Sequence, residues 1–308
     1  MNIAIIGVGG VGGYFGGKLA KAFEKDKSVK IYFIARGKHL EAIKENGLIL
    51  ESDDGAFICK PTLATDNISD LPEIDLFLIC VKSYDLKKAA FDLKDKISDK
   101  TMILPLLNGA DIYERIRKVI NNGVVFPACV YVGTHIENPG KIKQKGGSRT
   151  IHFGNDPNDD FVDENIFGIF QKANIMYNWN EKPFVEIWSK YIFIASFGLV
   201  TAAFDKSLGE VLDSYELRKN VENIMKEIYQ ISEKKEIGLP VTIVEESLKK
   251  GEKFPFETKT SFQRDYEIAD KPDERELLGE TVIRMGKELG VKIETTEKIY
   301  DIIQKTKK

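Results

Sequence analysis

The sequence has few cysteines and histidines. It contains three of each among 308 residues, and neither set shows the spacing of a CxxC pair or of a metal site. A disulfide framework needs an even set of cysteines, and a zinc site needs clustered cysteine and histidine ligands. We therefore expect reduced thiols, no bound metal and a cytoplasmic protein.

The chain also lacks an excess of either charge. Lys and Arg number 45 against 48 Asp and Glu, which gives a net charge of −3. Proteins that bind nucleic acid or anionic membranes usually present a strong positive excess. No basic segment precedes the first apolar run, and no apolar run reaches the length that we expect of a membrane span. A small molecule is therefore the expected partner, rather than nucleic acid or a membrane.

A glycine motif follows the first apolar run. Ile3–Ile6 leads into Gly7-x-Gly9-x-x-Gly12 and then into a helical pattern. In a dinucleotide-binding fold these glycines allow the tight turn, the approach of the pyrophosphate and close packing of the helix, whose N-terminus faces the phosphates. A purely structural turn is the alternative, and the strand and helix on either side favour the dinucleotide site. The expected cofactor contacts are Gly7, Gly9, Gly10, Val11 and Gly12.

Arg36 ends the second apolar run, Val29–Ala35. Proteins that prefer NAD usually place Asp or Glu here to hold the ribose 2′-hydroxyl, whereas a cation suits the 2′-phosphate of NADP. The alternative is a solvated arginine at a strand end. We expect NADP(H) as the cofactor.

Short apolar runs alternate with helical patterns in the first half of the chain, which is typical of a parallel sheet covered by helices. The pattern predicts strands over 75–81, 101–107, 124–132 and 174–178, a helix over 161–172, and hairpins over 47–59 and 141–154.

The second half shows helical periodicity only, beginning at Pro183, which suits a first helical turn. The run Ile192–Val200 is apolar on most faces and predicts a central buried helix, and Gly238-Leu-Pro240 is expected to end a later one. The predicted fold is an α/β Rossmann-type domain over 1–180, which binds NADP, and an all-α domain over 181–308 for substrate binding and dimerisation. A cleft between the two would hold ligands.

Three polar residues directly follow apolar strands: Arg36, Lys82 and Asn108. The carboxyl ends of parallel strands meet at one edge of a sheet, where open α/β sheets bind ligands. Lys82 could reach a phosphate or ribose, and Asn108 could contact the nicotinamide ribose or a substrate oxygen. The alternative is that strand ends are polar because they leave the core.

Lys190 lies near the start of the most apolar helical segment of the chain. Lysine is rarely buried, and apolar surroundings disfavour its charged form. Such a lysine can donate a proton or polarise a carbonyl during hydride transfer. The alternative is a lysine that extends to the surface from the edge of the helix.

With these features together, the chain resembles the ketopantoate reductase family, whose members reduce 2-dehydropantoate to pantoate with NADPH. The resemblance spans nearly the whole sequence. It implies that Lys190 is the catalytic general acid, that Asn108 contacts cofactor and substrate, and that Ser261 contacts the substrate carboxylate. The matching features are the glycine loop, Arg36-Gly37, Lys82, Asn108-Gly109, Pro139-Gly140, the strand ending at Gly154, Trp188-x-Lys190, Thr201-Ala202 and the stretch ending at Val291.

The sequence departs from the family at two positions on the lysine helix. The family usually has asparagines there, and this chain has Ile194 and Gly198. Asp273 stands opposite a family glutamate that meets the substrate hydroxyl, with Glu274 as the alternative. Because an unpaired polar group in a buried site is costly, these changes could switch the substrate. We expect an NADPH-dependent 2-dehydropantoate reductase; the alternatives are a reductase of a less polar 2-oxo acid and a non-catalytic NADP-binding sensor.

Overall fold

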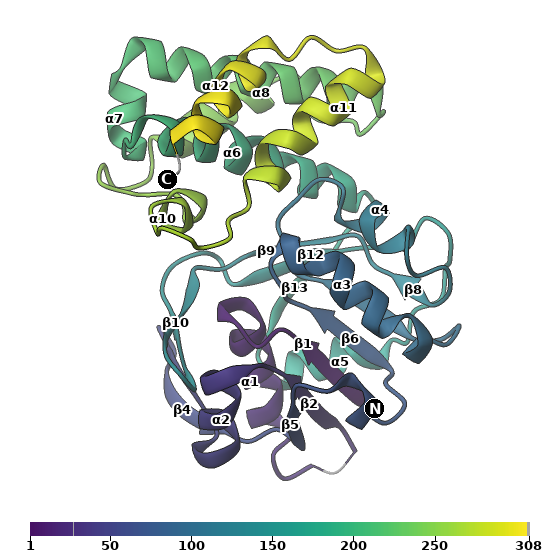
Figure 1. Ribbon diagram of the computed structural model, residues 1–308. Coiled ribbons are helices and arrows are strands. Elements are labelled where there is room, and N and C mark those ends of the chain that lie inside the picture. Colours follow the sequence, from purple (N-terminus) through teal and green to yellow (C-terminus); the bar gives the residue numbers. More distant parts are fainter. Residues whose placement is uncertain (27, 307–308) are drawn as a thin grey trace. The chain divides into compact units, whose positions relative to one another are not determined.

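The computed structural model describes residues 1–26 and 28–306, and the chain forms two compact units, Met1–Pro183 and Phe184–Lys308 (Figure 1). Every strand in these described ranges belongs to the first unit, and the second consists of helices and loops. The predicted fold class, α/β followed by all-α, is confirmed.

A six-stranded parallel sheet forms the centre of the first unit, in the order β5-β2-β1-β6-β7-β8. Its strands are β1 (Asn2–Ile6), β2 (Lys30–Ile34), β5 (Leu63–Thr65), β6 (Leu76–Ile79), β7 (Met102–Pro105) and β8 (Val124–Val125). The helices that follow these strands include α1 (Gly10–Ala22), α2 (Gly37–Asn46), α3 (Ser83–Leu93) and α4 (Ile112–Arg117), with short 3₁₀ turns at Ile68–Asp70 and Lys94–Lys96.

The strand order places the ligand-binding edge. Every residue of β6 and β7 is buried, as expected of central parallel strands that have both faces covered. β1 lies between β2 and β6, so the chain moves outward in one direction through β2 and β5, and in the other through β6, β7 and β8. This reversal is the switch point of a Rossmann-type sheet, where a crevice opens at the carboxyl ends of the strands.

Two smaller sheets complete the first unit. One has the strand order β10-β11-β3-β4, and the other has the order β13-β12-β9. In the sequence, helix α5 lies between β12 and β13. The antiparallel pair β3–β4 confirms the hairpin predicted over 47–59. The elements are β3 (Leu48–Ser52), β4 (Gly55–Cys59), β9 (Ala128–Tyr131), β10 (Thr134–Asn138), β11 (Lys141–Gln144), β12 (Thr150–Phe153), α5 (Asn165–Lys172) and β13 (Met176–Trp179).

Two sequence predictions in this region are wrong. The apolar run 124–132 is two strands in different sheets, because Pro127 lacks the N–H that a continuous ladder needs. Residues 141–154 are not a hairpin: β11 pairs with β10 and β3, whereas β12 pairs with β9 and β13. The hairpin turn lies instead at Pro139-Gly140, between β10 and β11.

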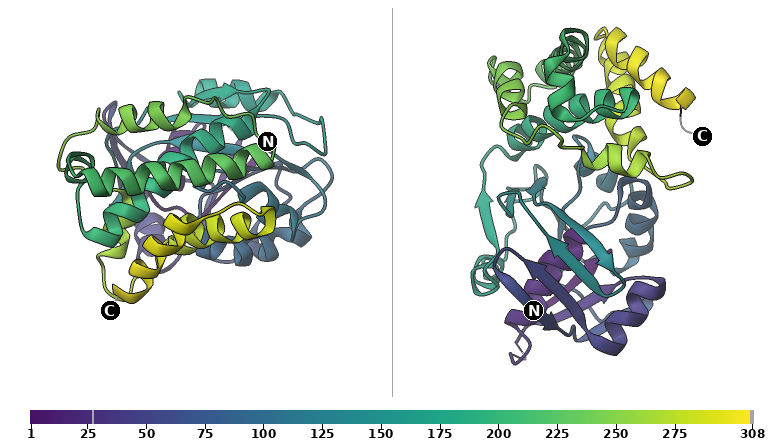
Figure 2. Two further views of the ribbon diagram at one scale, coloured as in Figure 1. Left: turned by 90° about the horizontal axis from the view of Figure 1, so that it is seen from above. Right: turned by 90° about the vertical axis from the view of Figure 1, so that its left-hand side faces the viewer.

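The second unit is built from helices and loops. Its long helix α8 packs against α7, α9, α11 and α12, and both views of Figure 2 show this green helix beside the yellow C-terminal helices. The elements are α6 (Pro183–Phe204), α7 (Leu208–Asp213), α8 (Tyr215–Lys234), α9 (Ile243–Gly251), α10 (Ser261–Tyr266), a π-helical turn η3 (Glu276–Glu280), α11 (Thr281–Leu289) and α12 (Glu294–Thr306).

Helix α6 corrects the expectation that no apolar run could span a bilayer. By length and composition alone α6 would suffice, but 78% of its most apolar window is buried within the protein. Its apolar faces are therefore those of a core helix, as the pattern of Ile192–Val200 predicted.

Helix α8 ends earlier than the sequence predicted. Its last helical residue is Lys234, and Glu236 adopts the left-handed conformation with φ of 56°. The N–H of Ile237 donates to the carbonyl of Ser232, and that of Glu236 to the carbonyl of Glu233, which together form a Schellman motif. Sequence reasoning assigned the stop to Gly238-Leu-Pro240 because glycine is the usual residue at the left-handed position.

A buried carboxylate on α8 caps α12. Glu227 is 9% exposed and accepts the backbone N–H groups of Thr295 (2.7 Å) and Thr296 (2.9 Å), as well as the Thr296 hydroxyl (2.6 Å). These N–H groups belong to the first turn of α12, which has no intrahelical partner for them. Glu227 therefore fastens the C-terminal helix to α8.

Replacing Glu227 by alanine should destabilise the protein by about 2–4 kcal/mol, because it leaves the part-buried N–H of Thr295 and the buried N–H and hydroxyl of Thr296 without an acceptor. Urea unfolding followed by circular dichroism measures the change. Gln230→Ala on the exposed side of the same helix is the control and should change the free energy of unfolding by less than about 0.5 kcal/mol. Equal effects of the two substitutions would contradict the assignment.

Candidate active site

Each glycine of the motif that follows β1 is required for a different steric reason. Gly7 has φ of 89°, and a Cβ there would lie 2.9 Å from Val81 Cγ1. A Cβ on Gly12 would lie 2.1 Å from the carbonyl oxygen of Gly7, so α1 could not pack against the loop. A Cβ on Gly9 would meet nothing within 4 Å, which leaves open space in front of the α1 N-terminus. This combination suits the approach of a pyrophosphate to backbone N–H groups.

The next two residues of the loop are held by packing. A Cβ on Gly10 would lie 2.8 Å from the carbonyl oxygen of Thr134, so the close approach of β10 requires this glycine. Val11 is partly buried and packs against the hydrophobic core. Packing therefore explains the residue type at both positions, and either residue would contact a cofactor through its backbone.

A cavity of about 360 Å³ opens beside this loop. Its walls are the glycine loop, the ends of β2 and β6, the first turns of α3 and Ile136 of β10. Arg36 and Lys82 both line it, so the parallel-sheet argument placed these two residues correctly together. Sequence reasoning missed the other polar residues of the wall: His39, Asp66, Asp85, Lys88 and Asp92.

The cavity wall carries one direct ion pair to Arg36. The Arg36 Nη2 donates to Asp85 Oδ2 at 2.8 Å, and the Arg36 side chain is 71% exposed. His39 Nδ1 accepts the N–H of Gly140 at 3.0 Å, and burial lowers the pKa of His39 against a smaller opposing effect of its backbone hydrogen bond with Val8. His39 is therefore a neutral wall residue at neutral pH. Burial likewise raises the pKa of the Cys80 thiol.

Asn108 follows β7, the strand next to β6 in the sheet. It is half-buried, and the following residue, Gly109, has φ of 131°. Asn108 is not among the residues that line the cavity around Arg36 and Lys82. The three strand-end residues therefore share the carboxyl edge of one sheet, but only two of them share a cavity.

Lys190 is a buried lysine on α6, with 9% of its surface exposed. Its neighbours Trp188 and Tyr191 are each 1% exposed, and the Tyr191 hydroxyl donates to the carbonyl of Leu277 at 2.7 Å. That bond joins α6 to the π-helical turn η3, an element found often at functional sites. Between Lys190 and Val200, Ile194 is the residue that is not buried.

The other predicted substrate residues of the helical unit have distinct surroundings. Ser261 is exposed at the start of α10, after Thr260, which caps that helix and lies 3.1 Å from Thr201 of α6, Oγ1 to Oγ1. Both carboxylate oxygens of Asp273 are bound by Arg275, at 2.9 Å to Nε and 2.7 Å to Nη2. Glu274 is 7% exposed. Arg275, which sequence reasoning missed, therefore occupies the carboxylate of Asp273.

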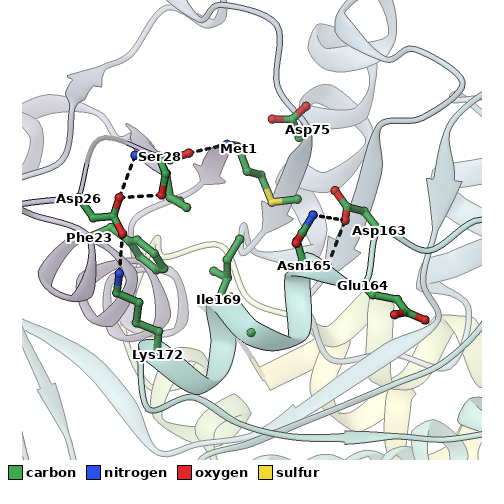
Figure 3. Close-up of a pocket in the computed structure, with 12 residues that line it drawn as sticks. Met1, Phe23, Asp26, Ser28, Asp75, Asp163, Glu164, Asn165, Ile169 and Lys172 are labelled. Carbon is green, nitrogen blue, oxygen red and sulfur yellow. Dashed lines mark hydrogen bonds and ion pairs between the residues drawn. The ribbon is translucent and has the colours of Figure 1, made fainter.

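A second cavity lies at the opposite edge of the sheet, around Met1 and the starts of β2 and β6 (Figure 3). Its volume is about 630 Å³. The Met1 ammonium donates to the carbonyl of Ser28 at 2.7 Å, and Asp26 joins Ser28 to Lys172. These polar groups are satisfied by one another, and the cavity is at the amino edge of the strands, away from the glycine loop. In residues 1–26 and 28–306, no group of three or more Asp, Glu, His or Cys side chains could hold a metal ion.

Comparison with known proteins decides the family. A model described as ketopantoate reductase PanE/ApbA matches residues 3–158, and the model of its C-terminal part matches residues 185–307. The chain belongs to the ketopantoate reductase family. It is therefore an oxidoreductase that acts on CH–OH groups, and its cofactor is a nicotinamide dinucleotide.

Known proteins match this chain over nearly their whole length. The oxidoreductase YkpB of Bacillus subtilis (strain 168) is 26% identical and covers 99% of this chain and 98% of its own length. The 2-dehydropantoate 2-reductase of Streptococcus pyogenes serotype M18 (strain MGAS8232) is 25% identical over 98% of this chain and 97% of its own. The crystal structure of a PanE/ApbA family ketopantoate reductase from Ralstonia eutropha JMP134 superposes with a TM-score of 0.89 at 25% identity, covering 99% and 97% of the two chains.

Proposed function

We propose that this ketopantoate reductase family member is an NADPH-dependent reductase whose substrate is 2-dehydropantoate. The observation that carries the proposal is the occurrence, in one chain matched by both family models, of an open glycine cradle and a buried lysine on the central helix. The cradle suits the cofactor and the lysine suits the carbonyl chemistry.

The fit of the cofactor rests on the residues of the first unit. Gly9 leaves space for a pyrophosphate at the N-terminus of α1, which has no acidic residue in its first turn to oppose an anion. Arg36 and Lys82 stand in the wall of the adjoining cavity and would hold the ribose 2′-phosphate and a further phosphate or ribose oxygen. The backbone of Gly7, Gly10, Val11 and Gly12 would complete the cradle, and Asn108 would contact the nicotinamide ribose.

The chemistry rests on Lys190. The hydride for the 2-oxo carbon would come from NADPH when it is bound. The Lys190 ammonium donates a hydrogen bond to the carbonyl oxygen, stabilises the negative charge that develops there, and passes it a proton. Ser261 and Asn108 would bind the substrate, together with a carboxylate at Asp273 or Glu274. Because Arg275 occupies both oxygens of Asp273, Asp273 would meet the substrate only if that ion pair opened.

One observation favours a second substrate class, a less polar 2-oxo acid. The partly exposed Ile194 offers no hydrogen bond one turn beyond Lys190. At Gly198, a Cβ would lie 3.3 Å from Leu278 Cδ1 and 3.6 Å from Phe262 Cδ1, so the space beside it is filled by apolar side chains. A substrate hydroxyl that needed a partner at either position would lose it.

The deciding experiment is a steady-state assay of reduced-nicotinamide oxidation with 2-dehydropantoate and with branched 2-oxo acids that lack its hydroxyl. We expect 2-dehydropantoate to give the highest kcat/KM, with NADPH preferred over NADH. A higher kcat/KM for the hydroxyl-free acids would establish the second substrate class, and equal use of NADH would contradict the role given to Arg36.

A cytoplasmic location and a homodimer formed by the helical unit remain predictions that cell fractionation and sedimentation test.

A further inference from the structure

Arg36 and Asp85 form an ion pair within the wall of the cavity that the proposed function gives to the adenosine end of the cofactor. Arg36 follows β2 and precedes α2, and Asp85 lies in the first turn of α3, after β6. The two side chains come from elements on either side of β1 and meet at 2.8 Å. Both line the same cavity, and the Asp85 side chain is 34% exposed.

Among the residues that the structure describes, the cavity wall has no excess of positive charge to attract a phosphate. The cations are Arg36, Lys82 and Lys88, and the anions are Asp66, Asp85 and Asp92, so the formal charges balance. Lys88 and Asp92 form an ion pair of their own. An arriving 2′-phosphate carries a charge of about −1.5 to −2 at neutral pH, and it would meet Arg36 with a carboxylate already bound to its guanidinium.

We propose that Asp85 is a determinant of cofactor specificity that competes with the 2′-phosphate of NADPH for Arg36. The proposal rests on the proposed function, in which Arg36 receives that phosphate. NADH has a hydroxyl in place of the phosphate and leaves the Arg36–Asp85 pair intact. Asp85 therefore reduces the advantage of NADPH over NADH below what Arg36 alone would give.

The substitution Asp85→Asn tests this idea because it keeps the shape of the side chain and an oxygen acceptor while it removes the charge. Because the Arg36 guanidinium would no longer be bound to a carboxylate, NADPH binding should tighten about five- to tenfold at low ionic strength, where screening is weakest. NADH binding should change by less than about twofold, since its ribose bears no charge there. Fluorescence titration of each reduced nucleotide measures the Kd directly, without turnover.

Asp92→Asn is the matched control, because Asp92 lines the same cavity but pairs with Lys88 rather than Arg36. It should leave the ratio of the two Kd values close to that of the unaltered protein. Weaker or unchanged NADPH binding in Asp85→Asn, with a normal melting temperature, would overturn the proposal. Weaker binding would show that the carboxylate positions Arg36 for the phosphate.

Arg36→Ala separates this proposal from the proposed function. If Arg36 binds the 2′-phosphate, Arg36→Ala weakens NADPH binding, and adding Asp85→Asn to it restores much less affinity than Asp85→Asn gains in the presence of Arg36. If Arg36→Ala leaves NADPH binding unchanged, the phosphate site itself is misassigned. If Arg36→Ala weakens binding and Asp85→Asn does not tighten it, only the competition by Asp85 is disproved.

Discussion

Lys190→Ala should lower kcat for 2-oxo acid reduction by about 10³-fold, because it removes the group that we propose stabilises charge on the carbonyl oxygen and donates the proton. Lys190 is buried on α6, as are Trp188 and Tyr191 of the same helix. The glycine cradle lies in the other unit of the chain, so the Kd for NADPH should stay within about twofold of its original value. Stopped-flow single-turnover kinetics measures the hydride step apart from product release.

The control for this substitution is Lys226→Ala, which removes an exposed lysine from α8 in the same unit. It should leave kcat unchanged. Because a truncated buried lysine can also alter packing, the melting temperature of both variants must be measured. A kcat for Lys190→Ala within about tenfold of the original, in a folded protein, would remove Lys190 from the mechanism.

Gly9→Ala should weaken NADPH binding by about 10- to 100-fold while the protein stays folded. The added methyl group would meet no protein atom within 4 Å, so the folded chain tolerates it. It would occupy the space in front of the α1 N-terminus, where we propose that the pyrophosphate approaches the backbone. Equilibrium titration with NADPH measures the loss, and thermal unfolding should shift little.

Gly168→Ala provides the matched control, since its Cβ also meets nothing within 4 Å and its position in α5 is away from the glycine loop. NADPH should bind this variant with its original Kd. Unchanged NADPH binding in Gly9→Ala would show that the pyrophosphate does not cross this glycine, and the cradle would then have to be placed elsewhere.

Much of the first unit could be predicted from short stretches of sequence. The spacing of Gly7, Gly9 and Gly12 predicted a steric requirement for each glycine, and the structure shows that requirement at each position. The predictions of strands 124–132 and hairpin 141–154 failed because local pattern does not say which sheet a strand joins. Pro127 divides the first of these runs, and β11 and β12 pair with different strands rather than with each other.

The helical unit was less predictable. Lys190 was found because a lysine in an apolar helix is unusual, and the structure buries it. The pairing of Asp273 with Arg275 was missed because both residues look like ordinary surface charges in the sequence. The end of α8 was misplaced because a glutamate, Glu236, adopts the left-handed conformation that the sequence pattern assigned to a glycine.

The sequence by itself determined the parallel sheet, the glycine cradle, the cation after β2 and the helical second half, because each depends on spacing within a few turns or strands of chain. Only the tertiary structure decided that Asp85 contacts Arg36, that Glu227 caps α12 and that Arg275 occupies Asp273. Whether a charge is solvated, paired or buried depends on what other elements bring to it. Asp85 meets Arg36 because β2 and β6, the strands that precede Arg36 and Asp85, flank the same strand, β1.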